Sequence, residues 1–137
     1  MNTQLISAPV SDGNYRYETL AYLDAYDAVL NCDYAFVAYL ETDSNGERRV
    51  RIRSSQTAGA VFEPAAMRSK ARETSAQGKP WFQWGYSFDP SPSDPRNIQF
   101  RVHVANGRVK EIEMLVQLRK ADGSADEAKS VRFPWPA

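Results

Sequence analysis

The stretch NIQFRVHVANGRVKEIEMLVQL, residues Asn97–Leu118, decides the fold class. In its first half apolar and polar residues alternate, which is the period-2 pattern of a strand with one buried face. Asn106-Gly107 follows, a pair that readily adopts the positive φ angles of a tight reversal. In the second half the apolar residues again share one parity. These residues are Ile98, Phe100, Val102 and Val104, then Ile112, Met114, Val116 and Leu118. The stretch therefore predicts an antiparallel β-hairpin.

Two pairings compete in this hairpin. A two-residue turn, Asn106-Gly107, sets Phe100 opposite Glu113, and the two apolar sets then point to opposite sides of the sheet. A three-residue loop, Ala105–Gly107, sets Phe100 opposite Ile112 and makes the glycine a bulge residue. Burying each apolar side chain contributes about 1.5–3 kcal/mol, so a single apolar face outweighs the usual turn preference. We therefore predict the three-residue loop.

Length and composition fit a small globular protein. At 137 residues, with 25% charged and 42% hydrophobic residues, the chain suits one domain, 1–137, in which residues 1–14 form an irregular N-terminal arm. Its apolar stretches are too short to span a membrane, and no basic and apolar leader is present. A single cysteine, Cys32, fits a reducing compartment. We therefore expect a cytoplasmic protein without membrane contact, although a chain that had lost a signal peptide would look the same.

Two segments of the N-terminal half carry periodic patterns. Tyr17–Leu30 has apolar and tyrosine side chains at helical spacing, which predicts an N-terminal helix with one buried face. Tyr34–Glu41 and Glu47–Ser54 flank Asn45-Gly46, which predicts a second hairpin with a two-residue turn. Tyrosine also favours strands, so a strand is the alternative for the first segment.

The second hairpin places three arginines on one face. Its turn pairs Asp43 with Arg48, and Arg49, Arg51 and Arg53 then project together. Their predicted neighbours on that face are Phe36, Ala38 and Leu40, while Val37 and Tyr39 share the other face with Val50 and Ile52. A solvated face is the plainer interpretation of such a row. The alternative is a phosphate-binding surface that continues onto a basic segment containing Arg68, Lys70 and Arg72.

The rest of the chain predicts one short helix and connecting segments. Pro64 suits a first helical turn and Gly78 suits a helix end, so a second short helix is predicted between them. Gln56–Phe62 and the proline-rich Asp89–Arg96 are predicted loops, and Lys129–Phe133 is a predicted closing strand. The fold class is therefore α+β and mostly antiparallel β: about five to six strands in a sheet or sandwich, one N-terminal helix and a candidate second short helix.

Lys79–Phe88 is the most aromatic segment of the chain. As a strand it places Phe82, Trp84, Tyr86 and Phe88 on one face and Trp81 on the other. We predict that the four-aromatic face is core, with a stacking platform for bases or sugars as the alternative. Trp81 and Trp135 are then the candidate anchors of a protein interface.

Little in the chain points to catalysis. His103 is the only histidine, and with Trp84 and Tyr86 it is the candidate lining of a small-ligand pocket. One histidine and one cysteine exclude multi-histidine and Cys-x-x-Cys metal sites. The sequence contains neither a glycine-rich phosphate loop nor a GxSxG motif. We therefore predict no metal, no cofactor and no catalytic residue.

Charge is unevenly distributed along a chain whose net charge is zero. Through Glu47 eight acidic residues accompany Arg16 alone, whereas sixteen basic residues accompany nine acidic ones from Arg48 onward. Such halves can pair within one fold or between subunits. The leading hypothesis is a non-catalytic protein-interaction or assembly protein that binds another protein or forms a homo-oligomer. The alternatives are a nucleic-acid-binding protein with an arginine-rich hairpin, and a small-ligand pocket or compact enzyme on a curved sheet.

Overall fold

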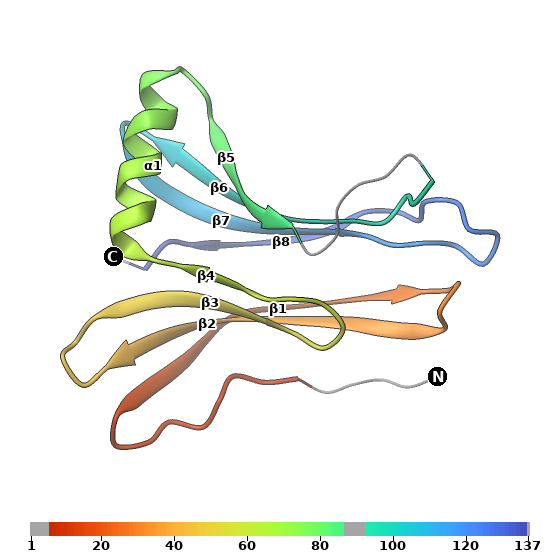
Figure 1. The fold of residues 1–137 in the computed structure, drawn as a ribbon, viewed down its shortest axis with the longest axis horizontal. Helices are drawn as coiled ribbons and strands as arrows, with labels where there is room; N and C mark the ends of the chain where they lie inside the picture. The colour runs from red at the N-terminus through yellow and green to blue at the C-terminus, as the bar shows by residue number, and fades with distance from the viewer. Residues whose placement is uncertain (1–5, 87–92, 137) are drawn as a thin grey trace.

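The computed structural model describes residues 6–86 and 93–136, and in them the chain is mostly antiparallel β with one helix (Figure 1). The strands form two four-stranded sheets, each in sequence order. Sheet A consists of β1 (Tyr15–Asp27), β2 (Cys32–Asp43), β3 (Arg48–Ser54) and β4 (Ala60–Phe62). Sheet B consists of β5 (Trp81–Tyr86), β6 (Asn97–Ala105), β7 (Arg108–Gln117) and β8 (Lys129–Pro134). The helix, α1 (Pro64–Ala76), connects the sheets. The mostly antiparallel class is confirmed, and the predicted strand count is too low.

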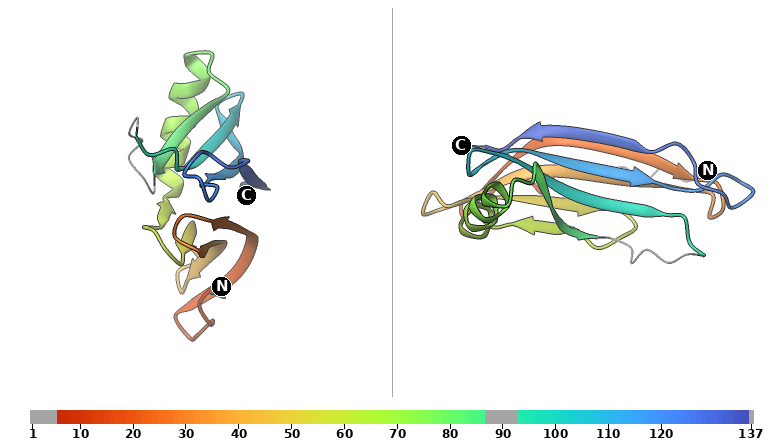
Figure 2. Two further views of the ribbon diagram at one scale, coloured as in Figure 1. Left: turned by 90° about the vertical axis from the view of Figure 1, so that its right-hand side faces the viewer. Right: turned by 90° about the horizontal axis from the view of Figure 1, so that it is seen from above.

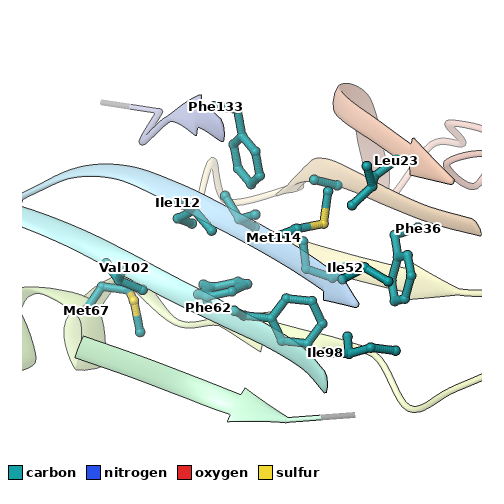
Figure 3. Close-up of a cluster of buried hydrophobic side chains, with 14 of the residues drawn as sticks. Leu23, Phe36, Ile52, Phe62, Met67, Ile98, Val102, Ile112, Met114 and Phe133 are labelled. Atoms are coloured by element: carbon teal, nitrogen blue, oxygen red, sulfur yellow. The ribbon is translucent and has the colours of Figure 1, made fainter. Parts of the chain in front are cut away.

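The two sheets stack face to face and enclose the hydrophobic core (Figures 1 and 2). Along β6 every second side chain is buried, as expected for a strand with one face on the core. Phe36 and Ile52 enter the core from sheet A, and Ile98 and Met114 enter it from sheet B (Figure 3). The layers are therefore held together mainly by burial of large apolar side chains from both sheets.

Side-chain contacts close the two long sides of this sandwich. On one side β1 and β8 run close together, and Lys129 Nζ donates to the carbonyl oxygen of Asp24 at 3.3 Å. On the other side the indole N–H of Trp84 on β5 donates to the carbonyl oxygen of Val61 on β4 at 2.8 Å. The two sheets thus remain separate ladders that are connected across their edges.

The hairpin formed by β6 and β7 has the predicted apolar face, but not the predicted loop. Asn106 and Gly107, with φ angles of 54° and 76°, form a two-residue turn. A register shift follows, because Lys110 of β7 has no pairing partner on β6. This bulge returns the apolar residues of β7 to the core face, so Phe100 lies opposite Met114. The three-residue loop was wrong because the bulge lies within the strand rather than in the turn.

Substitution of Gly107 tests how much the Asn106-Gly107 turn contributes to stability. Its φ of 76° lies in the left-handed region, where a Cβ costs about 1–2 kcal/mol. We expect Gly107→Ala to lower the free energy of unfolding by about that amount, measured by urea denaturation. Gly13→Ala is the matched control, because Gly13 has no neighbour within 4 Å and no left-handed φ. Equal stability of the two variants would contradict the turn assignment.

The predicted N-terminal helix is wrong, because Tyr17–Leu30 falls mainly in β1 and in the turn that follows it. From Tyr22 to Asp27 exposed and buried side chains alternate: Tyr22, Asp24 and Tyr26 are exposed, and Leu23, Ala25 and Asp27 are buried. Tyr22 and Tyr26 are four residues apart, a spacing that places them on one face of a helix and also on one face of a strand. Pairing along the whole of β2 decides for the strand.

The predicted register of the β2–β3 hairpin is also wrong by one residue. Thr42, rather than Asp43, pairs with Arg48. Asp43 instead organises the turn, since its carboxylate accepts the backbone N–H groups of Asn45 and Glu47 at 2.9 and 3.0 Å. The slip turns every side chain of β3 over. Val50 and Ile52 therefore join Phe36, Ala38 and Leu40 in the core, and the three arginines share the outer face with Val37, Tyr39 and Glu41.

The mid-chain helix is confirmed. α1 begins at Pro64, and Gly78, with a φ of 72°, lies just beyond its end. It packs across one end of sheet B, and Met67 and Ala71 are fully buried in the core. The predicted loop before it is partly wrong, since β4 forms within Gln56–Phe62. No helix of the described residues is long and apolar enough to cross a membrane.

Three further predictions of local structure are confirmed within the described residues, whereas the predicted loop Asp89–Arg96 lies partly outside them. Residues 6–14 are irregular, as predicted for the arm, and Arg53 Nη1 donates to the carbonyl oxygen of Ser7 at 3.1 Å. In β5, Phe82 and Trp84 pack against the core. Phe88 and the side chain of Tyr86 lie outside the described part. The predicted closing strand is β8.

Candidate functional site

Two adjoining clefts lie at the end of the molecule that carries α1, the C-terminal segment and the β2–β3 and β6–β7 turns (Figure 1). The first, of about 480 Å³, lies between the β2–β3 turn and α1. The second, of about 650 Å³, lies between α1 and the β6–β7 turn. Arg68 and Trp135 line both clefts. We call this continuous surface the arginine groove.

Three separate parts of the chain position its side chains. Arg68 and Arg72 are four residues apart on α1, so they project from the same face of the helix. Arg108 directly follows the Asn106-Gly107 turn, which is tied to the helix by a 2.9 Å hydrogen bond from the Gly107 N–H to Ser75 Oγ. Trp135 follows β8, and its N–H donates to the carbonyl oxygen of the bulge residue Lys110 at 3.2 Å.

The groove has an apolar floor. Leu40 and Val50 of sheet A line the first cleft, Val109 of sheet B lines the second, and the half-buried Trp135 spans both. An aromatic ring among aliphatic side chains is a typical anchor point for an apolar group of a ligand. The floor can therefore hold apolar side chains while the rim holds charges.

The rim of the groove is strongly basic. Five arginines line the two clefts, accompanied by a single acidic residue, Glu47. Arg49 is neutralised by Glu47, Glu41 and Glu63, with N–O distances of 3.2 to 3.5 Å. In contrast, no carboxylate oxygen of the described residues lies within 4.0 Å of the guanidinium groups of Arg68, Arg72 and Arg108. The groove thus presents three unneutralised cations to a ligand.

The predicted arginine row behaves differently. Arg49, Arg51 and Arg53 do lie side by side on β3, but the buried carboxylate of Glu41 holds two of them. Its oxygens lie 3.2 Å from Arg49 Nη1 and 3.0 Å from Arg51 Nε. Arg53 binds the N-terminal arm. Carboxylates therefore pair with two of the three arginines in this row, and the third donates to a neutral backbone carbonyl.

Trp81 and His103 lie on the outer face of sheet B, away from the groove. The guanidinium carbon of Arg101 lies 4.5 Å from the centroid of the half-buried Trp81 ring, which is a cation–π contact. His103 Nε2 lies 3.0 Å from Glu113 Oε1, and Arg132 Nη2 lies 3.5 Å from the other oxygen of Glu113. These side chains form a polar network across β5 to β8. Neither Trp81 nor His103 lines the arginine groove.

Trp84 packs inward rather than lining a pocket. Its ring stacks on Phe62 with centroids 6.1 Å apart, and its N–H is satisfied by Val61. The structure thus separates Trp84 from His103, and it places no three metal-ligating side chains of the described residues together.

The opposite end of the sandwich contains a second group of charges. Asp27 is fully buried, and Arg119 binds it through two hydrogen bonds, of 2.7 and 3.2 Å. Nearby, Arg96 donates to both oxygens of Asp94 and to the hydroxyl of Tyr34. The hydrogen bonds from Arg96 lower the pKa of Asp94 to about 2, so this carboxylate remains charged at neutral pH. This cluster joins the two sheets and is compatible with a structural role.

Sequence reasoning found most of the groove's cationic side chains but not their assembly. Arg49, Arg68, Arg72 and Trp135 are among the predicted binding residues, and Arg48 is not. Arg108 was also missed. Its position directly after a predicted turn was the available signal. Its proximity to α1 arises from a contact between segments more than thirty residues apart, Ser75 and Gly107.

The comparisons with known proteins place this chain in no family: no family model, no curated protein and no solved structure matches it.

Proposed function

We propose that the protein is a non-catalytic interaction module that binds an acidic segment of a partner protein in the arginine groove. The observation that carries this proposal is the convergence of Arg68, Arg72 and Arg108, without carboxylate partners among the described residues, around Trp135. A bound segment would place an apolar side chain on the tryptophan and carboxylates on the rim. Tryptophan and arginine are the residue types that contribute most at protein interfaces.

The chemistry of the groove favours recognition over catalysis. Arginine guanidiniums remain protonated at any physiological pH and so supply binding charge rather than proton transfer. His103, the one histidine of the chain, is bonded to Glu113 on the outer face of sheet B and does not line the groove. The groove therefore offers positive charge and apolar surface, which suit a peptide.

Charge and shape favour an acidic peptide over a nucleic acid. Nucleic-acid sites follow the phosphate backbone with a continuous basic stripe. Here Glu41, Glu47 and Glu63 pair with Arg49 and Arg51 of the β3 row, whereas Arg68, Arg72 and Arg108 of the groove have no carboxylate partner among the described residues. Leu40, Val50 and Val109 add an aliphatic floor, which suits apolar side chains better than phosphates.

Fluorescence anisotropy with a labelled peptide tests the proposal. The probe is a short peptide with leucine and valine at its centre and glutamates on both sides. We expect saturable binding that weakens as salt is raised, since exposed charges are screened beyond about 8 Å at physiological ionic strength. Arg68→Glu/Arg72→Glu is expected to weaken binding at least tenfold, because a hydrogen bond to a charged group contributes about 1.5–3 kcal/mol.

A charge-matched variant controls for long-range electrostatics. Lys70→Glu/Lys79→Glu makes the same change in net charge on and next to α1, but neither lysine lines the groove. It should reduce binding only slightly. Equal losses in both variants, or an affinity that does not respond to salt, would contradict the proposal. Tighter binding of a single-stranded oligonucleotide than of the peptide would instead favour a nucleic-acid function.

A further inference from the structure

The proposed groove needs an apolar segment flanked by acids, and this chain exposes one. We infer that the turn between β1 and β2 of a second copy docks in the arginine groove, so that the protein assembles head to tail. This inference rests on the proposed function and names the partner. We call residues Ala28–Asn31 of that turn the apolar turn.

The apolar turn projects two aliphatic side chains into solvent. Val29 is 44% exposed and Leu30 is 53% exposed, although both are large and apolar. Few other large apolar side chains of the described residues are as exposed, and the two are adjacent in the chain. Exposed apolar groups that cluster in this way mark interaction sites.

The backbone of the apolar turn is fixed before any partner binds. The Ala28 N–H donates to the carbonyl oxygen of Arg119 at 2.9 Å, and Asn31, with a φ of 51°, closes the turn in the left-handed region. Tyr26 donates a hydrogen bond to the side chain of Asn31. A turn held in this way loses little conformational entropy on docking.

Two aspartates lie on the outer face of sheet A, one before and one after the apolar turn. Asp24 is exposed near the end of β1, whereas Asp33, near the start of β2, is half-buried and already interacts within the chain. Asp24 makes no ion pair with a described residue, and its charge is available to a partner. The apolar turn thus combines apolar tips with the exposed carboxylate of Asp24, and the groove combines an apolar floor with a basic rim.

The position of the two surfaces dictates the kind of assembly. The apolar turn and the groove lie at opposite ends of the long axis of the molecule, so one copy cannot fill its own groove (Figure 1). A contact between two different surfaces is heterologous, and it generates either a ring or an open chain of copies. The acidic first part of the sequence and the basic second part then meet between subunits as well as within one.

Mixing two variants tests this arrangement. Val29→Ser/Leu30→Ser removes the apolar tips and leaves the groove intact, whereas Arg68→Glu/Arg72→Glu disables the groove and leaves the apolar turn intact. Sedimentation velocity from about 1 to about 200 µM should show concentration-dependent oligomers for the unmodified protein, a range that covers interfaces of micromolar Kd. Each variant alone should be monomeric. An equimolar mixture should form a heterodimer and nothing larger, because only one functional contact remains.

The outcomes separate this inference from the proposed function. Oligomers should persist in Lys70→Glu/Lys79→Glu and weaken with salt. A monomeric unmodified protein, or a mixture that stays monomeric, would overturn the inference, as would oligomers that survive loss of either surface. If the acidic peptide still binds in that case, the groove has a different partner and only the self-assembly fails. If the peptide does not bind either, the proposed function fails too.

Discussion

Replacing Arg119 with methionine is expected to lower the free energy of unfolding by about 3–5 kcal/mol. The side chain of Asp27 has no solvent exposure, and Arg119 supplies the two hydrogen bonds that compensate for its burial. Removing the guanidinium would leave a buried carboxylate without its charge partner, which costs far more than the ion pair itself contributes. Against a typical total stability of about 5–15 kcal/mol, this loss is large.

Chemical denaturation of the two proteins measures this difference directly. Lys120→Met is the matched control, because it removes one positive charge from the adjacent residue, whose side chain is exposed. It should change stability by no more than about 0.5 kcal/mol. Replacing both Asp27 and Arg119 by apolar residues should recover much of the loss, since the buried charge is then absent. A cost below about 1 kcal/mol for Arg119→Met would show that the pair is solvated.

Phe62→Ala is expected to cost about 3–5 kcal/mol of stability, the range for a buried phenylalanine. Phe62 is fully buried on β4 of sheet A, and its ring contacts Trp84 and Phe100 of sheet B, with centroid distances of 6.1 and 6.5 Å. It therefore fills the space between the sheets near their β4 and β5 edges. Truncation would remove the contact and leave a cavity that rigid strands on both sides cannot close.

Thermal and urea unfolding of Phe62→Ala provide the measurement. Tyr22→Ala serves as a control of similar size, because the Tyr22 ring is 42% exposed on the outer face of sheet A. It should cost clearly less than Phe62→Ala. Phe62→Leu should recover part of the loss by filling most of the volume. If the two alanine variants are equally stable, the sheets do not pack through Phe62.

The roles of Phe62 and Asp27 could not be predicted from the residues near them in the sequence. Phe62 belongs to a segment predicted to be loop, because three residues of strand give too short an alternation to detect. Asp27 lay within a predicted helix and had no visible partner, since Arg119 is ninety-two positions away. Both gain their importance from contacts between the two sheets.

The sequence predicted parts of the candidate site as well. Trp135 and the arginines of α1 were recognisable from residue type. Trp81 and His103 lie on the outer face of sheet B and Trp84 packs inward, so none of these three lines the groove. Residue type indicates what a side chain can bind. Only the packing of α1 against the β6–β7 turn determines which of them meet in one groove.

The sequence by itself determined the elements whose signal is local: the β6–β7 hairpin with its single apolar face, the helix bounded by Pro64 and Gly78, and the closing strand β8. Alternation, turn residues and helix ends depend on near neighbours, so they can be recognised in an isolated stretch. Only the tertiary structure decided that Tyr15–Asp27 pairs as β1, that the two hairpin registers shift, and that the sheets face one another. Each of these depends on which distant segment buries a given face, and that is a property of the whole chain.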